Sequence, residues 1–385
     1  MTWRYQVVLA GRGTDPRVGA VRRSVDKLAR DIGLDPALQL SVLGPDQVHA
    51  LDTRAPVAGV FFGGGNLSAD MVAAAERLVA DHAFMLPVVP TLDGYQRQVP
   101  EVLYGINGMA ASTADELSAV GLRVVEELGL VRRRRHAFLS YCRRDSAKVA
   151  QQVYQALDQR GWQVFLDTHS VSTGVPFQPF LWDRLNDADL LVLFDTPGAV
   201  TSHWVGEELA RASNLGIALL QLVWPGHDRA VGTDFAHVRY LNEADFRAGK
   251  WVTYGGRRLR SSEVRSIAFT AESIRARAVA VRRARLVGEL TARAAHHGLT
   301  ARAQPERFIE IEGRRDNYLF VPTIGAPRSA DLHDAEQYAH RGVPRLLYDP
   351  AGLLDSRRAH LGWLNSHLPV EAVPTTALGS WLETA

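Results

Sequence analysis

The sequence predicts an α/β protein whose sheets are mainly parallel, and three observations support this prediction. Short continuous apolar runs alternate with stretches of helical periodicity. Strands of this kind, separated by helices, are typical of parallel sheets covered on both faces. A composition of 46% hydrophobic and 22% charged residues is that of a globular protein and excludes disordered and fibrous classes. The 385 residues suffice for two to three domains of roughly 100–200 residues each.

The first predicted domain covers residues 1–131. Its apolar runs and helical patterns follow one another with short connections, as in a βαβ arrangement. The expected elements are strands at 5–10, 57–62 and 84–90 and helices at 18–32 and 69–82. The run Arg132-Arg133-Arg134-Arg135 then interrupts the pattern. A basic run of this length reads as a solvated linker, with contact to a phosphate as the alternative.

The second predicted domain covers residues 136–285 and repeats the alternation more clearly. A loop rich in Ser, Thr, Gly and Pro is expected at 168–179, and a long Arg- and Ala-rich helix at 262–294 leads into the next domain. The other expected elements are strands at 136–141, 163–166, 190–194 and 217–223 and helices at 146–160, 180–186 and 203–214.

A third, smaller α/β domain is predicted at residues 296–385, and no motif in it identifies a function. Its expected elements are strands at 308–311, 318–322 and 344–348 and helices at 330–340, 356–368 and 376–383.

Charge and cysteine content exclude several functional classes. The 44 basic and 42 acidic residues leave a formal charge of +2, which does not favour nucleic acid or an anionic membrane as a partner. A single cysteine, Cys142, excludes an internal disulfide and a cysteine-rich metal site. No set of metal ligands is predicted. The apolar stretch before Gly11 is too short for a signal peptide or a membrane span, so a soluble cytoplasmic protein is expected.

The first two predicted domains resemble each other. In the first, residues 60–62 precede a small-residue loop with Ser68, a helix, and the strand at 86–90. In the second, residues 193–194 precede a loop with Ser202, a helix, and the run at 220–225. Repetition on this scale indicates a duplicated domain and not a solenoid, because the period far exceeds the usual repeat lengths.

Three signatures in the second domain carry a resemblance to a known family. They are AFLSYCRRD at 137–145, GWQVFLD at 161–167 followed by a loop with Gly174 and Phe177, and SHWVGEEL at 202–209. In this order and spacing they resemble the TIR (Toll/interleukin-1 receptor) domain over about residues 136–285. The resemblance implies a flavodoxin-like fold with a parallel sheet, in which residues 168–179 form the long BB loop.

The resemblance implies that Glu208 is catalytic. Trp204 and Glu208 are four residues apart and therefore share one face of a helix. A carboxylate beside an aromatic ring can stabilise developing positive charge and position a sugar hydroxyl. The spacing alone favours a surface glutamate near a helix N-terminus, stabilised by the helix dipole, and the family resemblance reverses this interpretation. TIR enzymes use this glutamate to cleave the nicotinamide–ribose bond of NAD⁺. Glu207 is expected to be solvated.

Other candidate substrate contacts follow the first strand of this domain or lie near the helix with Glu208. Residues just beyond the carboxyl end of a parallel strand are where open α/β sheets bind ligands. Arg143 and Arg144 could contact a pyrophosphate or be ordinary surface arginines, and Trp182 and Trp224 could stack on a base or be core residues. The candidate substrate-binding residues are Tyr141, Arg143, Arg144, Asp145, Trp182, Ser202, Trp204 and Trp224.

The first domain has the TIR-like layout without its signatures. An ungapped alignment places Ala74 opposite Glu208 and Asp70 opposite Trp204, whereas a shift of two residues brings in Glu76. The loop Gly63-Gly64-Gly65-Asn66 follows a strand and precedes a helix, which suits either phosphate binding by backbone amides or a tight turn. We therefore expect a degenerate TIR-like or nucleotide-sensing domain.

The resemblance as a whole predicts an NAD⁺ glycohydrolase of the bacterial antiphage-defence type. It would release nicotinamide and either ADP-ribose or a cyclic isomer, with NAD⁺ as substrate and no cofactor. Self-association is expected, with Ser172, Gly174 and Phe177 forming an assembly loop that completes a neighbour's site, under control of a nucleotide or phage-derived activator. The alternatives are a TIR scaffold that only recruits partners, and a nucleotide-base processing enzyme in which the first domain is the active one.

Overall fold

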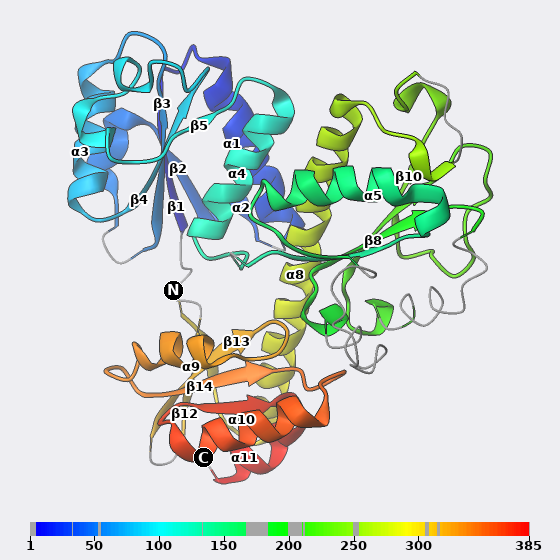
Figure 1. The fold of residues 1–385 in the computed structure, drawn as a ribbon. Helices are drawn as coiled ribbons and strands as arrows, with labels where there is room; N and C mark the ends of the chain where they lie inside the picture. Colours follow the sequence, from blue (N-terminus) through cyan, green and yellow to red (C-terminus); the bar gives the residue numbers. More distant parts are fainter. Residues whose placement is uncertain are drawn as a thin grey trace. The chain divides into compact units, whose positions relative to one another are not determined.

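The computed structural model describes residues 5–32, 34–52, 55–132, 134–166, 184–198, 210, 212–248, 254–304, 308–313 and 316–384. The chain divides into two compact units, Met1–Arg133 and Arg134–Ala385 (Figure 1).

The first unit is built on a parallel sheet with strand order β2-β1-β3-β4-β5. Its strands are β1 (Tyr5–Ala10), β2 (Leu40–Leu43), β3 (Val57–Phe62), β4 (Phe84–Val89) and β5 (Met109–Ala110). Its helices are α1 (Pro16–Asp31), α2 (Pro36–Gln39), α3 (Ala69–Ala80) and α4 (Ala114–Glu127), with the 3₁₀ turns η1 (Pro45–Ala50), η2 (Tyr95–Arg97) and η3 (Glu101–Leu103). The apolar strands are buried because α3 covers one face and α1 and α4 pack together on the other (Figure 1).

Local capping explains where the helices of this unit begin. Asp15 precedes the proline at the first helical position of α1, and its side chain accepts the backbone N–H of Arg17. Ser68 caps α3, and Thr113 and Glu116 form a reciprocal capping box on α4. These caps place the helix starts at the carboxyl ends of the preceding strands.

The second unit contains another parallel sheet, with order β10-β9-β8-β6-β7. Numbered along the chain, both sheets have the order 2-1-3-4-5, which is the flavodoxin-like arrangement. The elements here are β6 (His136–Ser140), α5 (Arg143–Asp158), β7 (Gln163–Leu166), β8 (Leu190–Asp195), β9 (Ala218–Val223), β10 (His237–Tyr240), η4 (Glu243–Asp245), η5 (Tyr254–Gly256) and α8 (Ser261–His296).

Alternate residues of these strands enter two separate cores. Leu139, Val192 and Leu220 pack with apolar residues of α5 and α8 on one face. Phe138 and Leu191 pack on the other face with residues of the segments before β8 and before β9. This alternation is what the continuous apolar strand sequences require, because both faces are covered.

A third sheet of the same unit has order β11-β12-β13-β14-β15; β11, β12 and β13 are antiparallel neighbours and the remaining pairs are parallel. Its elements are β11 (Ala301–Ala303), β12 (Ile309–Glu312), β13 (Asn317–Thr323), α9 (Ser329–Glu336), β14 (Val343–Tyr348), α10 (Asp355–His367), β15 (Glu371–Pro374), η6 (Thr375–Ala377) and α11 (Leu378–Thr384). Helices α8 and α11 cover one face, and α9 and α10 cover the other.

Helix α8 is shared by the second and third sheets (Figure 1). Its first half, with Ile267 and Ala271, enters the core of the second sheet, and its second half, with Leu286 and Leu290, enters the core of the third. The expected long helix that leads from one domain into the next is confirmed. Among the described residues, no helix is long and apolar enough to cross a membrane.

The end of the basic run is not a solvated linker. Arg135 forms an ion pair with Glu272 of α8 at 2.9 Å, and Arg134 pairs with Asp331 of α9. Beside them, the fully buried Arg275 contacts the fully buried Asp189 at 3.2 Å. A buried charge requires a partner, so the ion pairs of Arg135 with Glu272 and of Asp189 with Arg275 connect the amino edge of the second sheet to α8.

Candidate functional site

The two sides of the second sheet diverge at the carboxyl ends of β6 and β8. Strand β6 lies between β7 and β8. The chain forms β7 on one side of β6 and then crosses to form β8 on the other, so the carboxyl ends of β6 and β8 are the topological switch point of the sheet. Ligands of open α/β sheets bind at such a point. Tyr141 and Cys142 form the turn after β6, and Arg143 begins α5, three residues before the predicted helix start.

Asp145 joins the two elements at this edge. It lies in the first turn of α5 with 6% of its surface exposed, and one carboxylate oxygen accepts the backbone N–H of Gly198, beyond β8, at 2.7 Å. The other oxygen accepts from Nε of Arg144 at 3.1 Å. A carboxylate near a helix N-terminus is also stabilised by the helix dipole. Asp145 thus connects the two loops of the switch point.

Two glycines let backbone pack directly on the start of α5. A Cβ atom at Gly198 would lie 2.4 Å from Oδ2 of Asp145 and 3.1 Å from the sulfur of Cys142. A Cβ atom at Gly255 would lie 2.5 Å from the carbonyl oxygen of Arg144. Only glycine permits such approaches without displacement. The carboxyl edge is therefore closely packed around residues 142–145.

The basic and aromatic candidates around this turn differ in exposure. Arg143 and Arg144 are exposed, the Arg144 side chain at 78%, so their guanidinium groups are accessible to a solute. Tyr141 is half-buried, with its ring edge-on to Phe194 at a centroid distance of 6.3 Å. These two exposed guanidinium groups, close in sequence to a half-buried phenol, offer charge-assisted hydrogen bonds to an anionic ligand.

Trp224 lies in the core. It is 2% exposed and packs between the rings of Phe194 and Phe246, at 6.5 and 5.7 Å. Its backbone N–H donates to the carbonyl of Asp195 at 3.0 Å. Its buried indole N–H has no hydrogen-bond partner among the described residues. Of the two roles considered from the sequence, stacking on a base or packing in the core, the structure shows Trp224 in the core.

The other predicted site residues lie outside the described residues. They are Trp182, Ser202, Trp204 and Glu208 and the assembly-loop residues Ser172, Gly174 and Phe177. Their roles therefore stay predictions.

A polar cluster at the same edge escaped the sequence analysis. Asp195, 1% exposed at the end of β8, accepts from the Gln221 side chain at 2.7 Å and from the Ala230 backbone N–H at 2.8 Å. Nε2 of His227 lies 3.0 Å from its second oxygen. The sequence did contain a signal for this cluster, because Asp195 and Gln221 are polar residues within the apolar strand sequences LLVLFD and ALLQLV. The cluster fixes the loop after β9 to the carboxyl end of β8.

The first unit has glycine-rich loops at the equivalent edge. Nη2 of Arg17 donates to the carbonyl oxygen of Gly63 at 2.8 Å and pairs with Asp15 at 2.7 Å. Burial raises the pKa of Asp15, but its hydrogen bonds and ion pair with Arg17 outweigh burial and hold that pKa below its usual value. Gly64 adopts a φ of +90°, which favours glycine. The hydrogen bond from Arg17 thus fixes the loop at Gly63, and the chain turns sharply at Gly64.

The α3 helix of the first unit does not present a glutamate at the aligned position. Ala74 is fully buried in the core beneath α3, whereas Glu76 is exposed. The ungapped alignment therefore sets a core residue against Glu208.

Comparison with protein families identifies part of the second unit. Residues 137–251 match the model of the TIR domain. The matched segment begins at the second residue of β6, extends past β10 and contains the switch point described above. No curated protein matches the chain.

Solved structures similar to the chain share little sequence with it. A response regulator/GGDEF domain protein matches with 10% identity over 62% of this chain and 92% of its own, at a TM-score of 0.28. A protein assigned as a phosphosugar isomerase from Silicibacter pomeroyi has 11% identity over 73% and 86%, at 0.20. Tagatose-6-phosphate ketose/aldose isomerase from Escherichia coli has 13% identity over 73% and 82%, at 0.21. Scores this low support no inference.

Proposed function

We propose that the TIR domain of this chain cleaves NAD⁺ at the nicotinamide–ribose bond. The observation that carries the proposal is the TIR match over residues 137–251, a segment that contains both Trp204 and Glu208. The exposed Arg143 and Arg144 at the switch point support it, because a dinucleotide carries a pyrophosphate.

The proposed reaction is a substitution at the anomeric carbon of the ribose. The bond to nicotinamide breaks, its electron pair leaves with the nicotinamide, and positive charge develops on the sugar. The Glu208 carboxylate stabilises this charge. Water, or an adenine nitrogen of the same molecule, then bonds to the carbon and loses a proton. The products are nicotinamide and either ADP-ribose or a cyclic isomer.

We further propose that activity depends on assembly and serves antiphage defence. In this account the loop with Ser172, Gly174 and Phe177 completes the site of a neighbouring copy. A nucleotide or phage-derived activator that prefers the assembled state would shift the population toward it. Depletion of NAD⁺ or release of a signalling product would then follow from the same chemistry.

The test is chromatographic separation of the products after the full-length protein is incubated with NAD⁺. Wild type is expected to release nicotinamide, and Glu208→Gln is expected to abolish release while the protein stays folded by circular dichroism. Glu207→Gln is the matched control, because it removes an adjacent carboxylate that the predicted helical spacing puts one residue off the face shared by Trp204 and Glu208. No release by wild type at any concentration would favour a scaffold that only recruits partners.

A further inference from the structure

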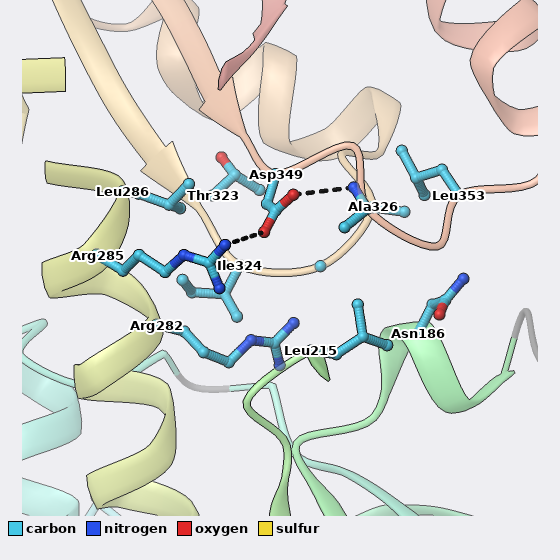
Figure 2. Close-up of a pocket in the computed structure, with 12 residues that line it drawn as sticks. Asn186, Leu215, Arg282, Arg285, Leu286, Thr323, Ile324, Ala326, Asp349 and Leu353 are labelled. Atoms are coloured by element: carbon cyan, nitrogen blue, oxygen red, sulfur yellow. Dashed lines mark hydrogen bonds and ion pairs between the residues drawn. The ribbon is translucent and has the colours of Figure 1, made fainter. Parts of the chain in front are cut away.

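A pocket lies within the second unit, where α8 passes the carboxyl edge of the third sheet (Figure 2). Thr323 ends β13 and Asp349 directly follows β14, so the pocket opens at the carboxyl ends of two parallel neighbours. Asn186 and Leu215 of the TIR domain form the opposite wall. Such an edge of an α/β sheet is a common place for ligands.

Two arginines supply the charge of this pocket. Arg282 and Arg285 are three residues apart on α8, on one face, and extend into the pocket (Figure 2). Asp349 is the one acidic residue among the described residues that line it. The Arg285 side chain is 66% exposed, and its Nη2 lies 4.0 Å from Oδ2 of Asp349. An exposed ion pair at so long a distance contributes little stability. Arg285 can therefore exchange Asp349 for a stronger anionic ligand.

Apart from Asn186 and Thr323, the remaining described lining is apolar and without aromatic rings, which suits a small non-aromatic group. Leu215, Ile324 and Leu353 lie around the arginines, and no aromatic side chain is among the described lining residues. A nucleobase would have no ring on which to stack. The chemistry therefore favours a small organic phosphate, whose anion meets the guanidinium groups.

The pocket is connected to the TIR domain through the turn at Asn186, Asp187 and Ala188. Nη1 of Arg282 donates to the carbonyl oxygen of Ala188 at 3.2 Å. Asp187 forms ion pairs with two arginines that belong to the third sheet's helices: Arg357 of α10 at 3.1 Å and Arg328, directly before α9, at 3.4 Å. This turn leads directly into β8, the strand that ends at the switch point.

We propose that this pocket is an effector site for a small organic phosphate, and that its occupancy rigidifies the turn at residues 186–188. The site is independent of the proposed cleavage of NAD⁺, and it would allow a metabolite to influence the TIR domain from the third sheet.

Binding is tested by calorimetric titration of the full-length protein with glycerol 3-phosphate at constant ionic strength, with glycerol as the neutral control. Wild type is expected to bind the phosphate saturably and not glycerol. Arg285→Gln should weaken binding about tenfold, which corresponds to about 1.4 kcal/mol. Asp349→Asn should strengthen it about threefold, because a competing charge is removed while an acceptor for the Ala351 N–H remains.

Arg293→Gln is the matched control, because Arg293 is another partly exposed, ion-paired arginine of α8 that does not line the pocket. It should bind like wild type. Hydrogen exchange of a peptide covering residues 184–190 should slow on binding. Absence of saturation at about 10 mM, or equal affinities in wild type, Arg285→Gln and Asp349→Asn, would overturn the site. Binding without slower exchange would overturn the coupling.

Discussion

Removal of the Asp145 carboxylate is expected to destabilise the TIR domain because this side chain joins the two loops of the switch point. Asp145→Ala loses the charge-assisted hydrogen bond of 2.7 Å that the carboxylate accepts from the backbone N–H of Gly198. A hydrogen bond to a charged group contributes about 1.5–3 kcal/mol, and a carboxylate at a helix N-terminus adds about 0.3–1 kcal/mol. We expect a loss of about 2–4 kcal/mol in the free energy of unfolding of the second unit.

Urea unfolding followed by tryptophan fluorescence measures this change. Of the eight tryptophans only Trp3 lies in the first unit, so the signal reports on the second unit. Asp158→Ala is the matched control, because Asp158 is exposed at the C-terminal end of the same helix, where the dipole does not favour a carboxylate. If Asp145→Ala loses no more than about 0.5 kcal/mol, or no more than the control, the role of Asp145 as a connection is refuted.

Three further predictions concern packing, pH and assembly. Gly198→Ala should lower the thermal midpoint by displacing Asp145, and a midpoint equal to wild type in calorimetry would contradict the packing. The lowered pKa of Asp15 means that its ionised form stabilises the fold above the pKa of the unfolded chain, and this stability is lost as the pH falls through the folded pKa. The stability difference between wild type and Asp15→Asn, measured by circular dichroism, should therefore narrow from pH 7 to about pH 3; a constant difference would exclude this linkage. Specific NAD⁺-cleaving activity should rise with protein concentration if the Ser172–Phe177 loop completes a neighbour's site, and a fully active dilute monomer would contradict assembly.

The sequence predicted the interior of the sheets well because buried parallel strands are continuous apolar runs. The run at 57–62 coincides with β3, and the run at 5–10 coincides with β1. Some edge strands escaped prediction, since β10 (His237–Tyr240) is half-exposed and polar and β5 has only two residues. The edge strand β7 was predicted at its observed range. Helix α4 was also missed, although its capping box at Thr113 was a usable local signal.

The site was predictable only where its residues are neighbours in sequence. The turn after β6 was placed correctly, because a strand followed by Tyr141 to Asp145 brings these residues to the carboxyl edge. The contact of Asp145 with Gly198 joins residues 53 apart, and the pairing of Asp189 with Arg275 joins residues 86 apart. Such pairings depend on strand order and packing, and the spacing of neighbouring residues in the sequence gives no information on either.

The most direct test of the central claim compares Glu208→Ala with Glu76→Ala in the full-length protein. Both variants remove a glutamate from the part of the chain between the third and fourth strands of a sheet with the same strand order, one in each unit. If the TIR domain is the enzyme, Glu208→Ala abolishes NAD⁺ cleavage and Glu76→Ala retains it, with both variants folded. Cleavage lost in Glu76→Ala and kept in Glu208→Ala would place the activity in the first unit and contradict the account.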